Sequence, residues 1–229
     1  MQPYEEVVRL MKAKSSSNRS EPTRVALMNA ALQVITETGV KSVTHRRVCA
    51  VAKVSLGTVN YHYADLNDLR LDAFSSYVDK VSARYEASFS VAHDDDDLAD
   101  AVLRLIDGLS EDTESAILMW ELYAEGGRDK SYRRLVRKWS KRAKSGVERF
   151  CSPFTATALE AMWDGAVMQR ILGDSSLPPE ELRKVILAII RLDEDRHYPQ
   201  LPADESAPKS VVGTARSSRR RTPAAVAAQ

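Results

Sequence analysis

Several polar and ionisable side chains between residues 44 and 63 are spaced closely enough to act together chemically. His45 and Cys49 stand four residues apart, so a helix would present two potential metal ligands on one face. No second pair at ligand spacing accompanies them, which favours a small packed cysteine over a metal site. Tyr61 and His62 would form an acid–base pair in isolation. A helical enzyme is a competing interpretation, but the chain has no GxxxxGKS/T, HExxH or GxSxG motif. We therefore predict no catalytic residues, no metal and no cofactor.

The same segment has the pattern of two short helices separated by a turn. Thr44 is placed to cap the first helix, whose apolar face repeats at helical spacing (Val48, Val51 and Ala52). Lys53 and Val54 form the turn, and Ser55 is placed to cap the second helix. That helix turns Val59 and Tyr63 inward. Its outward residues are mostly hydrogen-bonding groups: Leu56, Gly57, Thr58, Asn60, Tyr61 and His62. A short polar helix of this kind is typical of a helix tip that enters a DNA major groove.

A longer run, AALQVITETGVKSVTHRRVCAVAKVSLGTVNYHYADLNDL, resembles the N-terminal domain of the TetR family of transcriptional regulators. In that family a helix, here 24–38, is followed by a glycine, here Gly39. A threonine-capped helix, a turn and a segment similar to G-T-V/L-x-Y-H-F/Y come next. About 50 of the 229 residues match in order and spacing. The resemblance predicts an all-α protein with an N-terminal three-helix helix-turn-helix domain and a C-terminal helical ligand-binding and dimerisation domain.

The resemblance also implies roles for individual side chains. Tyr61 and His62 match family positions that contact backbone phosphates. Thr58 and Asn60 are suited to hydrogen bonds with base edges and Leu56 to a thymine methyl, each worth about 1–3 kcal/mol of discrimination. The first turn of the preceding helix can meet a phosphate through amides and side chains. The predicted DNA-binding set is Thr44, His45, Arg46, Ser55, Leu56, Gly57, Thr58, Asn60, Tyr61 and His62.

Two positions depart from the family pattern. Lys53 stands in the turn where the family usually has a small residue, commonly glycine, so we expect backbone strain there. Leu66 stands where the family often has a lysine that contacts a phosphate. One ionic contact is therefore expected to be missing, which would weaken DNA binding without changing the sequence that is read.

Composition agrees with this class of protein. The chain has 229 residues, 44% hydrophobic and 28% charged, with a net charge of +1. Between residues 18 and 63, however, six basic residues stand against two acidic ones, a local net charge of +4 that suits a phosphate-facing surface. No apolar run reaches the roughly 18 residues of a membrane span. Cys49 and Cys151 lack CxxC spacing, which favours reduced thiols. We expect a cytoplasmic protein without a membrane partner.

Four regions are expected along the chain. Residues 1–20 form a flexible N-terminal extension with a short amphipathic piece, 21–68 the helix-turn-helix domain, 69–193 the helical regulatory domain and 194–229 a disordered basic tail. Within the regulatory domain, periodicity predicts helices over 69–90, 98–109, 113–123, 131–150, 155–172 and 180–193.

The family resemblance implies two further sites in the regulatory domain. One is a small-molecule pocket, for which Trp120, Tyr123 and Trp139 are the first candidates among the large side chains and a small apolar compound is the expected ligand. For each of these side chains alone, ordinary core packing is the simpler interpretation. The other site is a homodimer interface made by the last two helices. The candidates are Leu159, Met162, Trp163, Ala166, Ile186, Ile189 and Ile190.

Charge is unevenly distributed in this domain. Residues 86–125 contain twelve acids and one base, whereas residues 128–149 contain ten bases and two acids. The basic stretch is either a second anion-binding surface or a solvated helix that faces an acidic neighbour, and the second interpretation is favoured because charged helix faces are usually solvated.

We conclude from the sequence that the chain is a sequence-specific DNA-binding regulator, a ligand-responsive repressor that binds an inverted-repeat operator in double-stranded DNA as a homodimer. The alternative is a helical interaction adaptor that retains a non-functional helix-turn-helix. Salt-dependent, sequence-specific DNA binding would exclude the adaptor.

Overall fold

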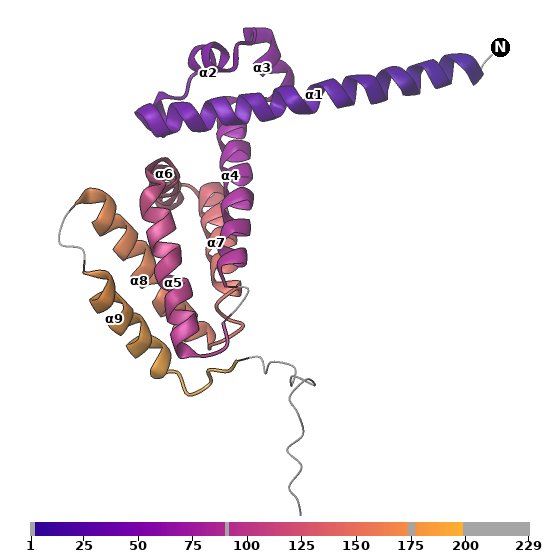
Figure 1. The fold of residues 1–229 in the computed structure, drawn as a ribbon. Helices are drawn as coiled ribbons and strands as arrows, with labels where there is room; N and C mark the ends of the chain where they lie inside the picture. Colours follow the sequence, from indigo (N-terminus) through magenta and orange to yellow (C-terminus); the bar gives the residue numbers. More distant parts are fainter. Residues whose placement is uncertain (1–2, 90–91, 174–176, 199–229) are drawn as a thin grey trace, which may run out of the picture. The chain divides into compact units, whose positions relative to one another are not determined.

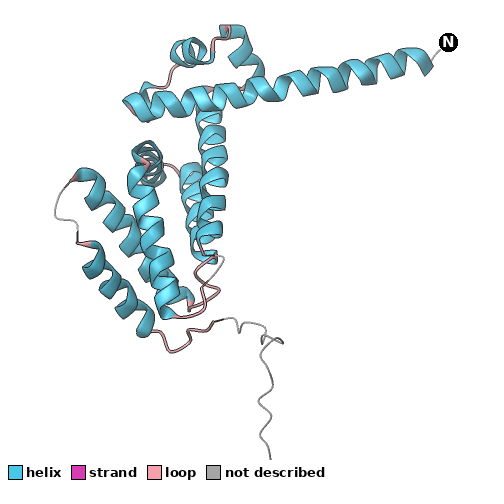
Figure 2. Cartoon of the chain, viewed as in Figure 1, coloured by secondary structure: helices cyan, strands magenta, loops and turns pink. Residues whose placement is uncertain are grey.

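The computed structural model describes residues 3–89, 92–173 and 177–198, with side chains from residue 21 onward. These residues form helices joined by short loops and contain no strand (Figures 1 and 2). The elements are α1 (Pro3–Thr38), the 3-10 helix η1 (Val40–Ser42), α2 (His45–Ala52), α3 (Leu56–His62), α4 (Leu66–Ser88), α5 (Asp95–Glu111), α6 (Thr113–Arg128), α7 (Lys130–Ser145), α8 (Pro153–Leu172) and α9 (Pro179–Arg191). The predicted all-α fold is confirmed.

The second half of α1 is the support for α2 and α3. Leu27, Ala31 and Ile35 recur at helical spacing and are fully buried, so one face of α1 packs against α2 and α4. Gly39 then ends the helix with a φ of 84°, a conformation that favours glycine because an added Cβ is strained there.

The remaining helices share one core that is rich in aromatic rings. The packed pairs are α4 with α7, α6 with α7, α5 with both α8 and α9, and α8 with α9. Trp139 and Trp163 are fully buried, and the ring of Tyr85 meets that of Trp139 edge-on with 4.4 Å between centroids. This core holds α4, α6 and α8 around the cavity described below.

Two ends of the described chain differ from the sequence prediction. α1 is continuous from Pro3, where the sequence favoured a short helix, a flexible lead-in and a new helix at residue 24. Ser and Asn reduce helix propensity by well under about 1 kcal/mol each, so the serine-rich stretch does not force a break.

At the other end, residues 194–198 belong to the packed domain, although the sequence assigned them to a disordered tail. The amide of His197 donates to the Phe150 carbonyl at 2.8 Å, and the Tyr198 hydroxyl donates to Asp95 at 2.8 Å. The predicted tail beyond residue 198 lies outside the described residues. Among the described helices, none is long and apolar enough to cross a bilayer.

Candidate functional site

The frame of the α2–turn–α3 motif is set by local hydrogen bonds. The Thr44 side chain accepts from the Arg47 amide at 3.3 Å, which is the predicted cap of α2. The turn depends on Lys53, whose φ of 55° and ψ of 43° make it the one non-glycine residue of the described chain with positive φ. The expected strain at this position is confirmed, since a left-handed conformation costs a side chain about 1–2 kcal/mol.

Two inward side chains hold α3 in place. Val59 is fully buried, and Tyr63 at the end of α3 is nearly so. The Tyr63 hydroxyl donates to one oxygen of Asp72 at 2.7 Å, and Arg24 donates to the other oxygen at 2.7 Å. Burial, reinforced by the hydrogen bond to Asp72, raises the pKa of Tyr63 and keeps its hydroxyl a donor. α1, α3 and α4 are thereby tied together through one carboxylate.

The outward face of α3 is open to solvent. Tyr61 is 77% exposed and Leu56 is 56% exposed, and Gly57 and Asn60 are exposed as well. Tyr61 and His62 meet edge-on with 5.1 Å between ring centroids, so the half-buried imidazole packs beside the phenol. A large exposed tyrosine beside small polar groups is the composition expected of a surface that meets a polar partner.

Ser55 does not cap α3 as the sequence predicted. Its hydroxyl instead lies 2.9 Å from that of Thr58, and no α3 amide donates to the Ser55 side chain. The two hydroxyls satisfy each other, which leaves Thr58 half-buried at the helix tip.

The start of α2 adds cationic groups to the same part of the motif. Arg46 is exposed, His45 is half-buried, and Thr44 is exposed at the cap. Arg47, which the sequence analysis did not select, is also exposed and is oriented by hydrogen bonds to the Thr38 hydroxyl at 2.9 Å and the Ser42 carbonyl at 3.4 Å. The sequence does not single out Arg47, because its partners Thr38 and Ser42 are brought to it only when the end of α1 and the start of α2 lie side by side. The described residues contain no group of three or more His, Cys, Asp or Glu able to hold a metal ion.

Leu66 begins α4 in place of the lysine that the family often carries. It is half-buried and packs against the hydrophobic core. The position therefore contributes apolar contact, while Asp65 caps the helix by accepting from the Asp68 amide at 2.9 Å.

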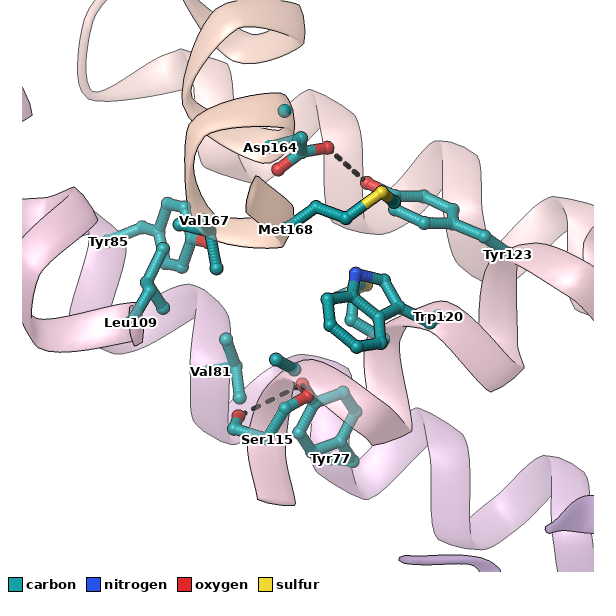
Figure 3. A pocket seen from close by; sticks show the side chains of 13 residues that line it. Tyr77, Val81, Tyr85, Leu109, Ser115, Trp120, Tyr123, Asp164, Val167 and Met168 are labelled. Atoms are coloured by element: carbon teal, nitrogen blue, oxygen red, sulfur yellow. Dashed lines mark hydrogen bonds between the residues drawn. The ribbon is translucent and has the colours of Figure 1, made fainter. Parts of the chain in front are cut away.

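A cavity of about 130 Å³ lies between α4, α5, α6 and α8 (Figure 3). Its lining is mostly aromatic and apolar: Tyr77, Val81, Tyr85, Leu109, Ser115, Ala116, Met119, Trp120, Tyr123, Asp164, Gly165, Val167 and Met168. Of the three predicted ligand-binding residues, Trp120 and Tyr123 lie on this wall. Trp139 lies behind it, fully buried, and its ring N–H donates to the Tyr123 hydroxyl at 3.0 Å.

Among the described residues that line the cavity, Asp164 carries the one carboxyl group. It accepts a hydrogen bond from the Tyr123 hydroxyl at 2.9 Å, drawn as a dashed line in Figure 3. Burial raises the pKa of Asp164 from 3.8 to about 6, since the carboxylate loses water that the hydrogen bond only partly replaces. The sequence carries a signal for this residue, an acid inside the apolar run AMWDGAVM, but the sequence analysis did not use it.

The predicted dimer surface needs correction. Leu159, Trp163, Ile186 and Ile190 are fully buried within the chain's own core and are unavailable to a partner. Met162, Ala166 and Ile189 are half-buried. Another face of α8 instead has an apolar seam with alternating spacings of four and three residues: Phe154, Ala158, Ala161, Gly165, Met168 and Leu172. Ala158 and Gly165 are half-buried, and Gly165 and Met168 also line the cavity, so the seam runs along the cavity's edge. Phe154 and Leu172 are 85% and 67% exposed. Val185, Ala188 and Leu192 give α9 a similar exposed face.

The basic stretch of α7 faces acids of the same chain, as the favoured interpretation predicted. Arg142 pairs with Asp79 at 2.8 Å and with Glu86 at 3.1 Å, and Lys138 pairs with Asp79 at 2.8 Å. Both acids lie on α4, so α4 and α7 are joined by charge as well as by apolar packing.

A hydrogen bond links the start of η1 to the cavity helix α6, in addition to the packing of α1 against α4 and α6. The Val40 amide, at the start of η1, donates to Glu121 of α6 at 3.4 Å. A Cβ at Gly39 would lie 3.2 Å from the same carboxylate, so glycine permits this approach. Glu121 follows Trp120, a cavity residue, so α6 contacts both sites.

Residues 93–192 match the family model described as the tetracyclin repressor-like C-terminal domain. The chain is 31% identical to a transcriptional regulator of Streptomyces coelicolor A3(2), with 73% of this chain and 98% of that one covered and a TM-score of 0.69. It is 28% identical to a TetR family member of the same organism, with 73% and 97% covered and a TM-score of 0.62. It is also 28% identical to the multidrug binding protein EbrR, solved with ethidium, with 73% and 97% covered and a TM-score of 0.60.

No curated protein sequence matched the chain significantly. The family model agrees with the helical domain that it matches, and the structural relatives agree with the all-α fold. They also exclude an enzyme, because members of this family are non-enzymatic transcription factors. The chain belongs to the TetR family of DNA-binding transcriptional regulators.

Proposed function

We propose that this regulator is a repressor that binds an inverted-repeat operator as a homodimer and leaves it when a small molecule occupies the α4–α5–α6–α8 cavity. The observation that supports DNA reading best is the exposed polar face of α3 on a helix clamped from behind by Val59 and Tyr63. Hydrogen bonding to base edges requires outward side chains on a rigid frame, because ordering mobile side chains on binding reduces the affinity for DNA.

On this proposal the outward residues divide into two roles. Asn60 and Thr58 hydrogen-bond base edges and Leu56 meets a thymine methyl, while Gly57 permits close approach of the helix tip. Tyr61, His62, His45, Arg46, Thr44 and Ser55 contact the phosphate backbone and set the register. Arg47 joins this second group because its side chain is already oriented by Thr38 and Ser42.

The homodimer is proposed to form through the seam on α8 and the exposed face of α9. A seam with small residues at its centre, Ala158, Ala161 and Gly165, lets two helices approach closely. Large apolar residues flank this centre, and large exposed apolar patches on a single chain favour association. Two copies related by a two-fold axis would then place two α3 helices about 34–36 Å apart on DNA, as an inverted repeat requires.

The ligand response is proposed to pass through α6. Trp120 lines the cavity, and the next residue, Glu121, holds the first amide of η1. A ligand that moves α6 would therefore move the support of the helix-turn-helix motif. A free-energy difference of about 1–3 kcal/mol between the two states changes DNA occupancy by about 5–150-fold. The likeness to EbrR, solved with ethidium, proflavin and malachite green, supports a small-molecule role for the same domain.

The test is selection of genomic DNA fragments by the purified full-length protein at about physiological salt. The matched control is the Thr58→Ala/Tyr61→Ala variant, which alters only the α3 face. A second control, Arg134→Ala/Lys141→Ala, removes two exposed charges of α7. Recovery of an inverted repeat by the wild type and the α7 variant, but not by the α3 variant, supports the proposal. Equal recovery by all three, or none, contradicts it and favours an adaptor role.

A further inference from the structure

The cavity encloses a negative charge for which the described chain provides no cation. The Tyr123 hydroxyl donates a hydrogen bond to Asp164, and the Trp163 ring N–H stabilises the same carboxylate more weakly. No lysine or arginine of the described residues forms an ion pair with it. A carboxylate away from bulk water without a partner is costly, and proteins usually pair or neutralise such a group. Because Asp164 lies at the wall of a cavity, we take the missing positive partner to be a ligand.

The neighbouring groups do not supply that partner. The second acid near Asp164, Glu160 of α8, has its own partners on α7: one of its oxygens lies 3.5 Å from Lys144 and accepts from the Ser140 hydroxyl at 2.9 Å. The negative charge of Glu160 raises the pKa of Asp164 further, so it supplies no counter-charge. The titratable groups near Asp164 on the other helices are the phenols of Tyr85 from α4 and Tyr123 from α6, while the phenol of Tyr77 lies across the cavity beside Ser115. α5 contributes only Leu109 to the wall. The cavity therefore holds one uncompensated negative charge at neutral pH.

The wall around this charge favours a cation that donates few hydrogen bonds. Tyr77 donates its hydroxyl proton to the Ser115 carbonyl at 2.6 Å, and Tyr123 donates to Asp164 itself. Tyr77, Tyr85, Tyr123 and Trp120 place four aromatic rings in the cavity wall. Aromatic rings attract cations through their faces, and aromatic cages are a recurrent means of binding quaternary ammonium groups.

The volume limits the size of the guest. At about 130 Å³ the cavity is slightly smaller than an engineered cavity of about 150 Å³ that holds one benzene molecule. A ligand with one aromatic ring and a compact charged group therefore requires only small displacements. The side chain of Met168 can make these displacements, because methionine is flexible and this wall residue is 44% exposed.

We propose that the cavity binds a compact aromatic organic cation, with the Asp164 carboxylate as its counter-charge. This specifies the ligand class of the proposed ligand response and rests on it. Anionic ligands are disfavoured at the same place by the same charge.

The experiment compares two probes of nearly equal shape, phenyltrimethylammonium and tert-butylbenzene, in which a positive nitrogen replaces a carbon. Neither probe titrates, so any pH dependence belongs to the protein. Binding to the full-length dimer or monomer, without DNA, is measured by calorimetry and by tryptophan fluorescence, since Trp120 lines the cavity. We expect the cation to bind at least about tenfold more weakly to Asp164→Asn, the loss typical of a charged hydrogen-bonded contact. Affinity for the neutral probe should stay within a few-fold.

The pH dependence provides a second readout. With a pKa near 6 for Asp164, lowering the pH from about 7.5 to 5 leaves about a tenth of the carboxylates ionised. Cation affinity of the wild type should fall about tenfold over that range, and that of Asp164→Asn should stay level. Glu160→Gln is the matched control, an acid-to-amide change one turn away on α8. Its cation affinity at about pH 7.5 should stay within a few-fold of the wild type, and the fall in affinity should occur at a lower pH, because the Glu160 charge contributes to the raised pKa of Asp164.

The outcomes separate this proposal from the proposed function. Equal affinity for the two probes, no loss in Asp164→Asn, or no binding of the cation overturns the cation proposal. If the neutral probe alone binds and releases operator DNA, the ligand response stands and the charge assignment fails. If the cation binds through Asp164 while DNA affinity is unchanged, the site stands and the ligand response fails. Circular dichroism of Asp164→Asn confirms that the variant is folded.

Discussion

Asp164→Asn is expected to stabilise the protein at neutral pH, although it removes a hydrogen-bonded carboxylate. Burial raises the pKa of Asp164 from 3.8 to about 6, so the folded state binds a proton more tightly than the unfolded state does. The favourable contribution of the protonated form is fully present below about pH 4 and is lost as the pH rises through about 6.

The magnitude follows from the size of that shift. A difference of about two pKa units corresponds to about 3 kcal/mol at about 1.4 kcal/mol per unit. Because the carboxylate lies at a cavity wall and keeps its bond to Tyr123, about 2–3 kcal/mol is the expected range. Asparagine retains the shape and can still accept the Tyr123 hydroxyl proton, so the variant avoids the charge penalty without losing that bond.

Urea unfolding followed by circular dichroism between about pH 4 and 7.5 measures the difference between variant and wild type. The difference in the free energy of unfolding should be near zero at the acid end and rise to its full value above about pH 6.5. Asp107→Asn is the matched control, because it breaks the exposed ion pair with Arg170 and should destabilise by about 1 kcal/mol at most. A variant at position 164 that is less stable than wild type at pH 7.5 would refute the reasoning.

Three further predictions concern the proposed DNA-binding dimer. Lys53→Gly removes the strain at φ 55° and should raise the free energy of unfolding by about 0.5–1 kcal/mol in urea titrations; an unchanged midpoint would contradict the strain. Arg46→Ala should leave the free energy of unfolding within about 0.5 kcal/mol of the wild type. In fluorescence anisotropy it should lower the slope of log affinity against log salt by about one unit per DNA-binding head, and an unchanged slope would show that Arg46 does not contact a phosphate. Ala161→Arg, at the centre of the α8 seam, should give a monomer in analytical ultracentrifugation and greatly weaken operator binding, whereas Glu148→Arg in the exposed α7–α8 loop should do neither.

The sequence predicts the helix-turn-helix domain well because its signals are local. Thr44 as a cap, Gly39 with positive φ and the inward spacing of Val59 and Tyr63 each depend on residues within one or two turns. Even the anomaly at Lys53 is readable, since the turn needs a left-handed residue whatever its side chain. Ser55 is the local exception. Its hydroxyl can bond either to a backbone amide of α3 or to the Thr58 hydroxyl, and the preference of serine for helix caps does not decide between these two partners.

The buried faces of the regulatory domain are harder to predict, because its helices have apolar residues on more than one side. On α8, both the buried Leu159 and Trp163 and the exposed Phe154 and Leu172 recur at helical spacing. Periodicity identifies two apolar stripes, but only the packing of α5 and α7 against one of them decides which faces the core. The dimer candidates Leu159 and Trp163 belong to the stripe that faces the core, because large apolar residues are preferentially buried in the chain's own core.

Asp164 illustrates why a binding site is less predictable than a motif. Its neighbours in the cavity, Tyr77, Tyr85 and Tyr123, come from α4 and α6, roughly 40 to 90 residues earlier in the chain. In the sequence each tyrosine is indistinguishable from a core residue. The apolar run around Asp164 marks the acid as unusual, but it does not reveal which groups its carboxylate meets. Only the packing of α8 against α4 and α6 combines an apolar wall with a carboxylate that lacks a cation. The chemistry of the cavity thus depends on the contrast between Asp164 and Glu160, two acids four residues apart on one helix, of which α7 neutralises only one.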